Sequence, residues 1–314
     1  MGANPLAGIV LERPKDRFTK MKIIIGTRGS SLALAQARSV GRMLEAAGAR
    51  VEITEIKTSG DKASAPLAEL GGKGLFVKEI DEALLSGRID VAVHSMKDVP
   101  GIMPEGIEIA AVPEREDARD AFVSRKSDSL SLLPMGARVG TSSPRRRALL
   151  LKMRGDLDVV PMSGNVETRL KKLEKGEADA VILAVAGLRR LEAGKEITEI
   201  LPVGRMIPAI GQGALAVEAR SSDRAVIDFV HKACHHAASG IITLAERSLL
   251  KAVGGDCYTP LAGYAEIRPS GLHLVGFLAT KDGRRSIVDC EDGPLENAAG
   301  IGRRLGERML KAIS

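Results

Sequence analysis

The chain has 314 residues, enough for two or three domains, and 44% of them are hydrophobic. It contains five Phe, two Tyr and no Trp, which argues against an aromatic platform that stacks nucleic-acid bases. The formal net charge of +6 comes from scattered lysines and arginines rather than from a basic tail. A small anion therefore suits this charge better than nucleic acid does, although ordinary solubility also accounts for it.

The N-terminal segment, the lack of long apolar runs and the cysteines argue against a secreted, membrane-spanning or disulfide-rich protein. Residues 1–20 lack leading cations and a cleavage site, so we interpret them as an N-terminal extension. No run of 18 apolar residues is present, which predicts no membrane span. The three cysteines, Cys234, Cys257 and Cys290, are too widely spaced for a disulfide framework or a zinc motif. We expect a cytoplasmic protein with no bound metal.

The N-terminal third alternates between strand and helix patterns, which predicts an α/β unit with a largely parallel sheet. The predicted order is strand 21–27, helix 31–48, strand 50–58, helix 75–86 and strand 89–95. The polar, glycine-rich stretch 59–74 has no periodicity and interrupts this alternation.

The pattern then repeats. The segment 137–150, "ARVGTSSPRRRALL", echoes 23–36, "IIIGTRGSSLALAQ": a strand, Gly-Thr, a serine and a helix. The repeat predicts two α/β lobes, 21–116 and 120–206, with a cleft between them. Residues 207–220 are predicted to cross back to the first lobe, so that 214–231 belong to it. In open α/β sheets, ligands bind beyond the carboxyl ends of strands, where both Gly-Thr turns fall.

Residues 236–314 have a different character and predict a third, smaller α+β domain. A helix over 241–253 leads to a Gly-Gly loop that carries Cys257. A hairpin over 272–290 turns at Asp282-Gly283, and a last amphipathic helix covers 295–313.

Cations and capping residues gather at these predicted strand ends. Ser143 is a predicted N-cap and Pro144 a first helical residue, so the arginines that follow add positive charge to a helix N-terminus. Guanidinium groups bind carboxylates as planar forks, which points to a ligand with several carboxylates. For any single arginine, a solvated surface position is the alternative. The candidate anion-binding residues are Arg28, Ser30, Ser143, Arg145, Arg146, Asn165, Arg169 and Arg190.

Two other residues are candidates for chemistry. Asp98 follows an apolar strand and a lysine, where a carboxylate near cations stays ionised and can stabilise a cationic intermediate or move a proton. A turn aspartate before Val99-Pro100 is the alternative. Cys257 lies in a glycine-flanked loop that suits an attachment point or nucleophile, and an inert buried thiol is the alternative. His94 is better interpreted as a packed strand residue than as a catalyst.

These motifs, in this order, resemble those of the porphobilinogen deaminase family, also called hydroxymethylbilane synthases. The similarity runs from Met21 to the last helix. The motifs that carry it include "GTRGSSLALAQ", "GGKGLFVKE", "AVHSMKDVP", "GTSSPRRR", "SGNVETRL", "PAIGQGALAVE" and "CYTPLAGYAE". The resemblance implies two lobes like those of type II periplasmic binding proteins and a third domain with the cofactor cysteine.

The resemblance also implies the activity. A dipyrromethane cofactor, made from the enzyme's own substrate, is held by a thioether to Cys257. Four porphobilinogen units are added to it head to tail with loss of ammonia, and hydrolysis releases 1-hydroxymethylbilane. Each pyrrole ring carries an acetate and a propionate, so the cations listed above, with Lys97, are expected to meet these carboxylates. The enzyme is expected to be a monomer with no nucleic-acid or membrane partner.

Three further roles follow from the resemblance. Asp98 is expected to contact the pyrrole N–H groups and to stabilise the azafulvene that forms when ammonia leaves. Phe76 is expected to pack against a ring. Lys73 belongs to the stretch 59–74, a candidate lid over the cleft.

Two residues depart from the family pattern. Ser163 stands where family members commonly have Arg, so an anchor is lost or supplied by a nearby cation such as Lys172. Asp256 precedes the cofactor cysteine where Gly is usual, and its carboxylate is expected to raise the thiol pKa and slow cofactor attachment. The competing class is a two-lobed anion receptor or sensor without catalysis, because fold alone does not define function.

Overall fold

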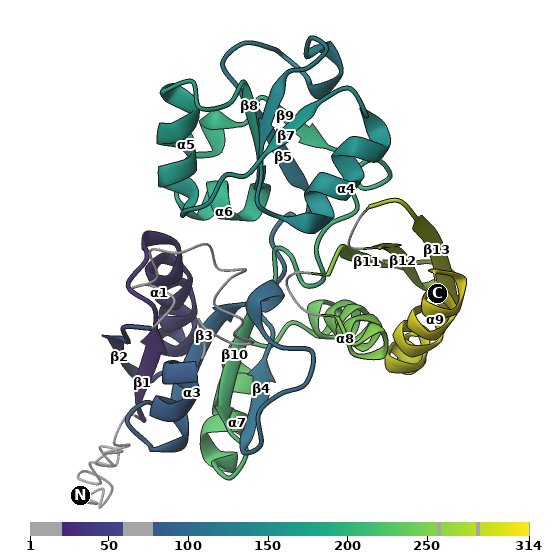
Figure 1. Ribbon diagram of the computed structural model, residues 1–314. Helices are drawn as coiled ribbons and strands as arrows, with labels where there is room; N and C mark the ends of the chain where they lie inside the picture. The colour runs from purple at the N-terminus through teal and green to yellow at the C-terminus, as the bar shows by residue number, and fades with distance from the viewer. Residues whose placement is uncertain (1–20, 59–77, 256–258, 281–282, 314) are drawn as a thin grey trace, which may run out of the picture.

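The computed structural model describes residues 21–58, 78–255, 259–280 and 283–313. It has two α/β lobes, the first below and the second above in Figure 1, and a smaller α+β unit at their side. This arrangement confirms the predicted fold class. Among the described residues, no helix is both long enough and apolar enough to cross a membrane.

The first lobe is a five-stranded sheet with the order β2-β1-β3-β10-β4. Strands β1, β2 and β3 run parallel, and β10 is antiparallel to both of its neighbours. The largely parallel sheet is confirmed, with one reversed strand. Helices α1 and α7 bury their apolar faces in one core, which includes Ile25, Leu44, Val93, Val217 and Val230. The elements are β1 (Lys22–Thr27), α1 (Ser31–Ala46), β2 (Arg50–Glu55), α3 (Lys78–Leu85), β3 (Val91–Ser95), β4 (Ile107–Ala111), β10 (Leu215–Arg220) and α7 (Arg224–Cys234).

The second lobe repeats this plan with the order β7-β6-β8-β5-β9. Strand β6 lies parallel between β7 and β8, as β1 lies between β2 and β3, and β5 is the reversed strand. The repeat predicted from the two Gly-Thr turns is therefore present in the topology. The elements are β5 (Asp120–Ser124), β6 (Arg138–Gly140), α4 (Pro144–Met153), β7 (Asp158–Val160), α5 (Val166–Glu174), β8 (Ala180–Ala184), α6 (Val185–Arg190) and β9 (Glu199–Leu201).

The chain crosses between the lobes twice, through residues 112–119 and 202–214. Because β10 lies in the first sheet, the predicted return crossing is confirmed. The two connectors are bonded to each other: Arg115 Nε donates to the Gln212 carbonyl at 2.8 Å, and Gln212 Nε2 donates to the Ala118 carbonyl at 2.6 Å. Gly213 has a φ of +89°, and a Cβ there would lie 2.2 Å from the Glu116 carbonyl oxygen. Only glycine permits this close approach.

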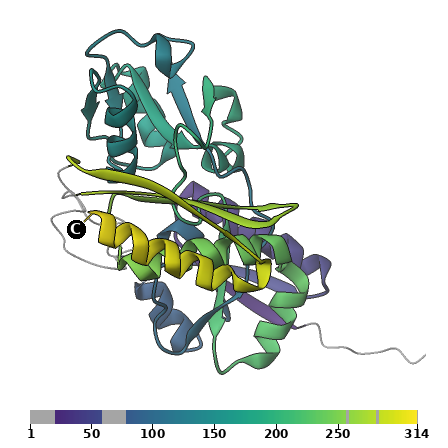
Figure 2. The same cartoon turned by 90° about the vertical axis from the view of Figure 1, so that its right-hand side faces the viewer.

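The third domain packs helices α8 (Ala237–Val253) and α9 (Ala298–Ile313) against one three-stranded antiparallel sheet (Figure 2). Its strands are β11 (Leu261–Arg268), β12 (Gly271–Ala279) and β13 (Ser286–Gly293). The predicted hairpin is confirmed as β12–β13, whereas β11 was not predicted. The last helix begins three residues late because a 3-10 turn occupies Leu295–Asn297.

A buried glutamate joins the third domain to both connectors. Glu246 of α8 is fully buried, and its Oε1 lies 2.7 Å from Nη1 of Arg115. Its two oxygens also accept backbone N–H groups, from Gly211 at 2.7 Å and from Ala265 at 2.9 Å. One carboxylate thus bonds to the first connector, the second connector and strand β11.

Candidate active site

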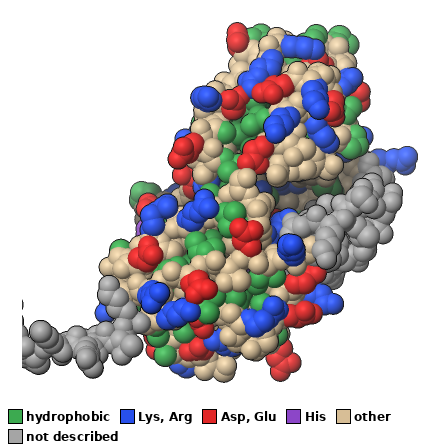
Figure 3. Space-filling model, turned by 90° about the vertical axis from the view of Figure 1, so that its left-hand side faces the viewer, with side chains coloured by type: hydrophobic (Ala, Val, Ile, Leu, Met, Phe, Trp, Pro, Cys, Tyr) green, Lys and Arg blue, Asp and Glu red, His purple; other side chains and the backbone are tan. Residues whose placement is uncertain are grey.

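A small pocket lies where strands β1 and β3 end, at the edge predicted for ligand binding. Its lining includes Arg28, Ser30 and Asp98, which the structure brings together, and His94. Seen from the left of Figure 1, the surface is hollowed between the two lobes (Figure 3).

The local sequence explains how these side chains are placed. Ser30 is the N-cap of α1, and its Oγ accepts the backbone N–H of Ala33 at 3.3 Å. The cap orients the first turn of α1, whose remaining N–H groups favour an anion. Asp98 lies in a single 3-10 turn, Met96–Asp98, directly after β3. Among the described residues its exposed carboxylate makes no hydrogen bond, so nothing there supports a turn-capping role.

Lys97 links the two lobes electrostatically. Its side chain is exposed, yet the loss of hydration between the lobes lowers its pKa. Asp98 and Asp120 oppose this effect, while Arg146 and Arg145 of the second lobe add to it. Charged groups of both lobes therefore act on this first-lobe lysine.

The loop after β6 has the predicted helix start. Ser143 caps α4, accepting the backbone N–H of Arg146 at 3.4 Å, and Pro144 occupies the first turn. The arginines, however, are not surface charges: Arg145 is 4% exposed and Arg146 is 5% exposed. The alternative of a solvated position is therefore wrong for both.

An aspartate of the same lobe binds both arginines. Asp120, at the start of β5, lies 2.7 Å from Nη1 of Arg145 and 2.7 Å from Nη2 of Arg146. Gln212 of the second connector donates a further hydrogen bond to its Oδ1 at 3.0 Å. Burial alone would raise the pKa of Asp120, but Arg145 and Arg146 outweigh it and hold the pKa well below its usual range.

Sequence reasoning missed Asp120. The signal available was its place in "EREDARDAFVS", where an acid opens an apolar, buried strand and needs a cation. One carboxylate balances only one of two guanidiniums, so the cluster keeps a net positive charge toward an incoming anion.

The remaining predicted cations lie on α5 and α6. Asn165 caps α5, and its Oδ1 accepts the Thr168 N–H at 2.8 Å. Arg169 donates to the Gly164 carbonyl at 2.8 Å; burial, followed by repulsion from Arg146, lowers its pKa to about 10. Arg190 donates to the Gly213 carbonyl at 2.6 Å. Like-charge repulsion between Arg169 and Arg146 indicates that the two guanidiniums share one region.

The position of the first family departure has a cation beside it. Ser163 is exposed, and Lys172 Nζ lies 3.3 Å from its carbonyl oxygen. A lysine therefore lies beside Ser163, as expected if a nearby cation replaces the missing arginine.

These groups suit a polyanion. The pKa of Arg169 and of Arg190 is lowered chiefly by burial, so these half-buried cations have too few carboxylates nearby to compensate for their lost hydration. Several predicted features lie outside the described residues, so the structure does not place them. They are the extension 1–20, the candidate lid 59–74 with Lys73, and Phe76, Asp256 and Cys257.

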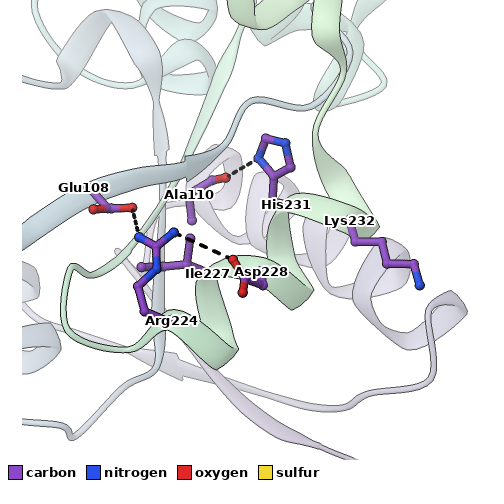
Figure 4. Close-up of a pocket in the computed structure, with 7 residues that line it drawn as sticks. All are labelled: Glu108, Ala110, Arg224, Ile227, Asp228, His231 and Lys232. Carbon is purple, nitrogen blue, oxygen red and sulfur yellow. Dashed lines mark hydrogen bonds and ion pairs between the residues drawn. The ribbon is translucent and has the colours of Figure 1, made fainter.

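A second pocket, between β4 and α7, holds none of the predicted site residues (Figure 4). Its charges satisfy one another: Arg224 lies 3.3 Å from Glu108 and 3.7 Å from Asp228. His231 Nδ1 lies 3.1 Å from the Ala110 carbonyl oxygen. This pocket has no excess charge to attract an anionic substrate.

Fold and site together define a class: a two-lobed α/β protein with a cationic region between its lobes and a third domain fixed to both connectors. The sequence model described as "Porphobilinogen deaminase, dipyromethane cofactor binding domain" matches residues 23–228. That described as "Porphobilinogen deaminase, C-terminal domain" matches residues 241–311. The chain belongs to the porphobilinogen deaminase family.

Individual relatives cover nearly the whole chain. The porphobilinogen deaminase of Geobacter sulfurreducens is 49% identical over 295 residues, covering 92% of this chain and 91% of its own. That of Pelobacter propionicus is 50% identical over 289 residues, covering 91% and 93%.

Solved structures of binding proteins are distantly similar. A nutrient binding protein from Burkholderia cenocepacia has a TM-score of 0.41 at 15% identity, covering 66% of this chain and 89% of its own. An arginine-specific periplasmic binding protein from Salmonella typhimurium has a TM-score of 0.40 at 14% identity, covering 68% and 91%. Their ligands say nothing about the ligand of this chain.

Proposed function

We propose that this protein is a hydroxymethylbilane synthase. It condenses four porphobilinogen molecules head to tail, with loss of ammonia, and hydrolyses the product to release 1-hydroxymethylbilane. The observation that carries the proposal is the match of both family domains, and it is supported by a first-lobe pocket lined by Asp98, Arg28 and Ser30. The dipyrromethane cofactor serves as the primer to which the units are added.

The cationic region fits the carboxylates of such a ligand. Arg28, Arg169 and Arg190 supply guanidinium forks, and Lys97 supplies a point charge. Ser30 and Ser143 use their oxygens as helix caps, which leaves each hydroxyl hydrogen free to be donated to a carboxylate. Arg145 and Arg146 add the net positive charge that Asp120 does not neutralise.

Asp98 is the proposed catalytic group. Its exposed side chain lines the pocket with Arg28 and Ser30. A carboxylate at this point accepts a pyrrole N–H and stabilises the cation that forms when ammonia leaves the substrate. It also accepts the proton that the attacking ring loses when the new carbon–carbon bond has formed.

The proposed attachment point is Cys257, through a thioether. The helix α8 ends at Gly254, in the left-handed conformation, and β11 begins at Leu261, so the loop that carries Cys257 starts from the domain fixed by Glu246. We further propose a monomer in the cytoplasm with no nucleic-acid or membrane partner. The proposed domains are 21–116 with 214–231, 120–206 and 236–314, after an extension over 1–20.

The intact mass of the protein from a heme-making host tests the proposal. We expect the wild type to carry an excess equal to one dipyrromethane and Cys257→Ala to carry none. Cys290→Ala, which removes an exposed cysteine of the same domain, is the matched control and should keep the excess. A bare wild-type mass that stays bare after incubation with porphobilinogen would instead favour the anion receptor.

A further inference from the structure

Three ligand-forming side chains meet behind the active-site pocket. Asp81 comes from α3, His94 from β3 and Glu218 from β10. One ligand atom from each lies within 4.8 Å of those of the other two. The antiparallel pairing of β3 with β10 sets this arrangement, because Ala216 is opposite His94 and Glu218 therefore lies one diagonal step away on the same face.

The imidazole of His94 lacks a partner in this cluster. His94 is 6% exposed and Glu218 is 2% exposed. Nε2 of His94 is buried and makes no hydrogen bond among the described residues. It lies 3.8 Å from Oε2 of Glu218, which is too long for a hydrogen bond. A buried polar atom left without a partner is destabilising, and such atoms in folded proteins call for an explanation.

Among the described residues, neither carboxyl group forms an ion pair with a lysine or an arginine. Arg247 attracts the Glu218 carboxylate electrostatically, but the Nη2 of Arg247 donates its hydrogen bond to the Pro100 carbonyl, at 2.8 Å.

We propose that Asp81, His94 and Glu218 bind a divalent transition-metal ion of the zinc class. One imidazole nitrogen and two carboxylate oxygens are a ligand set that zinc accepts, with a fourth position left for water. At tetrahedral angles such ligand atoms stand about 3.4 Å apart. The His94–Glu218 separation of 3.8 Å needs to close by only a few tenths of an ångström.

The ion would fix the position of the catalytic turn. It joins α3 to two neighbouring strands, and β3 continues directly into the turn that ends at Asp98. His94 lies between the pocket and the proposed metal site: it lines the pocket together with Asp98, and its Nε2 faces Glu218. The proposed role is a positioning one, because Asp81 and Glu218 do not line the pocket that contains Asp98. Glu218 lies 124 residues after His94, and Asp81 and His94 are on different elements, which is why no spacing motif predicted the three ligands.

The experiment is a titration of the untagged, cofactor-loaded enzyme with Zn²⁺ alone, followed by calorimetry and by thermal unfolding. An exposed group, His273, Cys290 and Asp292, could bind zinc adventitiously, so the background carries H273A and C290S. Glu218→Gln keeps the shape of the side chain and removes its charge. Asp81→Asn also keeps the shape of its side chain and removes the charge, at a half-buried position. It replaces Glu218→Gln in the test if that variant does not fold. Glu82→Gln, an exposed neighbour on α3, is the matched control.

We expect one Zn²⁺ per chain and a rise in the unfolding temperature, both retained in Glu82→Gln. Loss of Glu218 or Asp81 should weaken binding by more than the about 10- to 100-fold caused by loss of an outer-shell partner. No binding in this background would overturn the proposal, and would mean that a proton alone neutralises the cluster. Binding that survives both substitutions would equally overturn it, because the ion would then lie elsewhere.

Discussion

The two lobes begin alike, with a parallel strand, a Gly-Thr turn and a helix capped by serine, yet they use the turn differently. In the first lobe the cation precedes the cap: Arg28 comes before Ser30 and lines an open pocket with Asp98. In the second lobe the cations follow the cap: Arg145 and Arg146 come after Ser143, and both are buried.

An arginine two residues before a helix cap and an arginine two or three residues after one therefore have different environments. A residue before the cap belongs to the loop and stays accessible at the strand end. A residue after the cap is held by helical geometry, which turns it inward toward Asp120. The first lobe thus contributes side chains that line a pocket, and the second lobe contributes buried arginines that are bonded to Asp120.

The largest effect is expected for Asp98, in the pocket of the first lobe. Asp98→Asn keeps the shape of the side chain but removes its charge and its ability to accept a proton. We expect turnover per cofactor-loaded molecule to fall by about 10²- to 10⁴-fold, with an unchanged unfolding temperature. Mass spectrometry counts loaded molecules, and a product assay gives turnover. Asp128→Asn, an exposed aspartate of the second lobe, is the control; equal turnover in the two variants would contradict the role of Asp98.

The buried arginines of the second lobe are tested by substitution of their partner, Asp120. Asp120→Ala leaves two buried guanidiniums without their carboxylate, and removing one partner of a buried pair costs about 3–5 kcal/mol of unfolding free energy. Urea unfolding measures the loss, and Asp120→Asn, which keeps hydrogen-bond acceptors, should lose less. If Asp120→Ala unfolds like the wild type, the arginines do not depend on this partner.

The pH dependence of the same pair has a definite sign. Because the folded pKa of Asp120 is depressed, its contribution is fully present above the ordinary Asp range near 4 and is lost as the pH falls through the folded value. The stability difference between wild type and Asp120→Asn should therefore shrink between about pH 4 and pH 2. A difference that stays constant over this range would show that the charge of Asp120 is not what stabilises the fold.

A smaller effect is expected at the accessible arginine. Arg28→Ala should raise KM for porphobilinogen by about 10- to 100-fold, the value of a hydrogen bond between charged groups, and should leave stability nearly unchanged. Arg38→Ala, an exposed arginine on α1, controls for general charge. An equal rise in both variants would indicate long-range attraction rather than a contact at the strand end.

The smallest effect concerns the caps. Ser30→Ala and Ser143→Ala should each cost about 1 kcal/mol of unfolding free energy, because each removes one acceptor from a helix start. Ser142→Ala, an exposed neighbour outside the cap, should cost almost nothing. If Ser142→Ala and Ser143→Ala unfold at the same urea concentration, the N-cap is not a source of stability in the second lobe.

Most of the fold could be predicted from local sequence patterns. The cap at Ser143, the repeat of the Gly-Thr turns and the return crossing over 207–220 were all predicted, because each depends on neighbouring residues or on a repeated motif. Strand β11 was missed because it follows a glycine-rich loop and lacks a clear alternation.

Long-range pairing could not be predicted in the same way. Asp120 lies 25 residues from Arg145. His94 and Glu218 are brought together by the sheet order, and Asp81 joins them through the packing of α3 on that sheet. Burial of an arginine depends on which carboxylate the fold places beside it, and no local window contains that information. The sequence therefore identified the residue types of the site better than their partners.

The carboxylate of Glu246 determines where the molecule is able to bend. It holds Arg115 of one connector, Gly211 of the other and Ala265 of β11 at once. Any rotation of one lobe against the other that keeps these bonds has its pivot close to this residue. The third domain is joined to this pivot and also packs against the second lobe, because Ala262 and Phe277 share one apolar cluster with Phe122. A rotation of the lobes about Glu246 would therefore carry the third domain with the second lobe and move the first lobe relative to both.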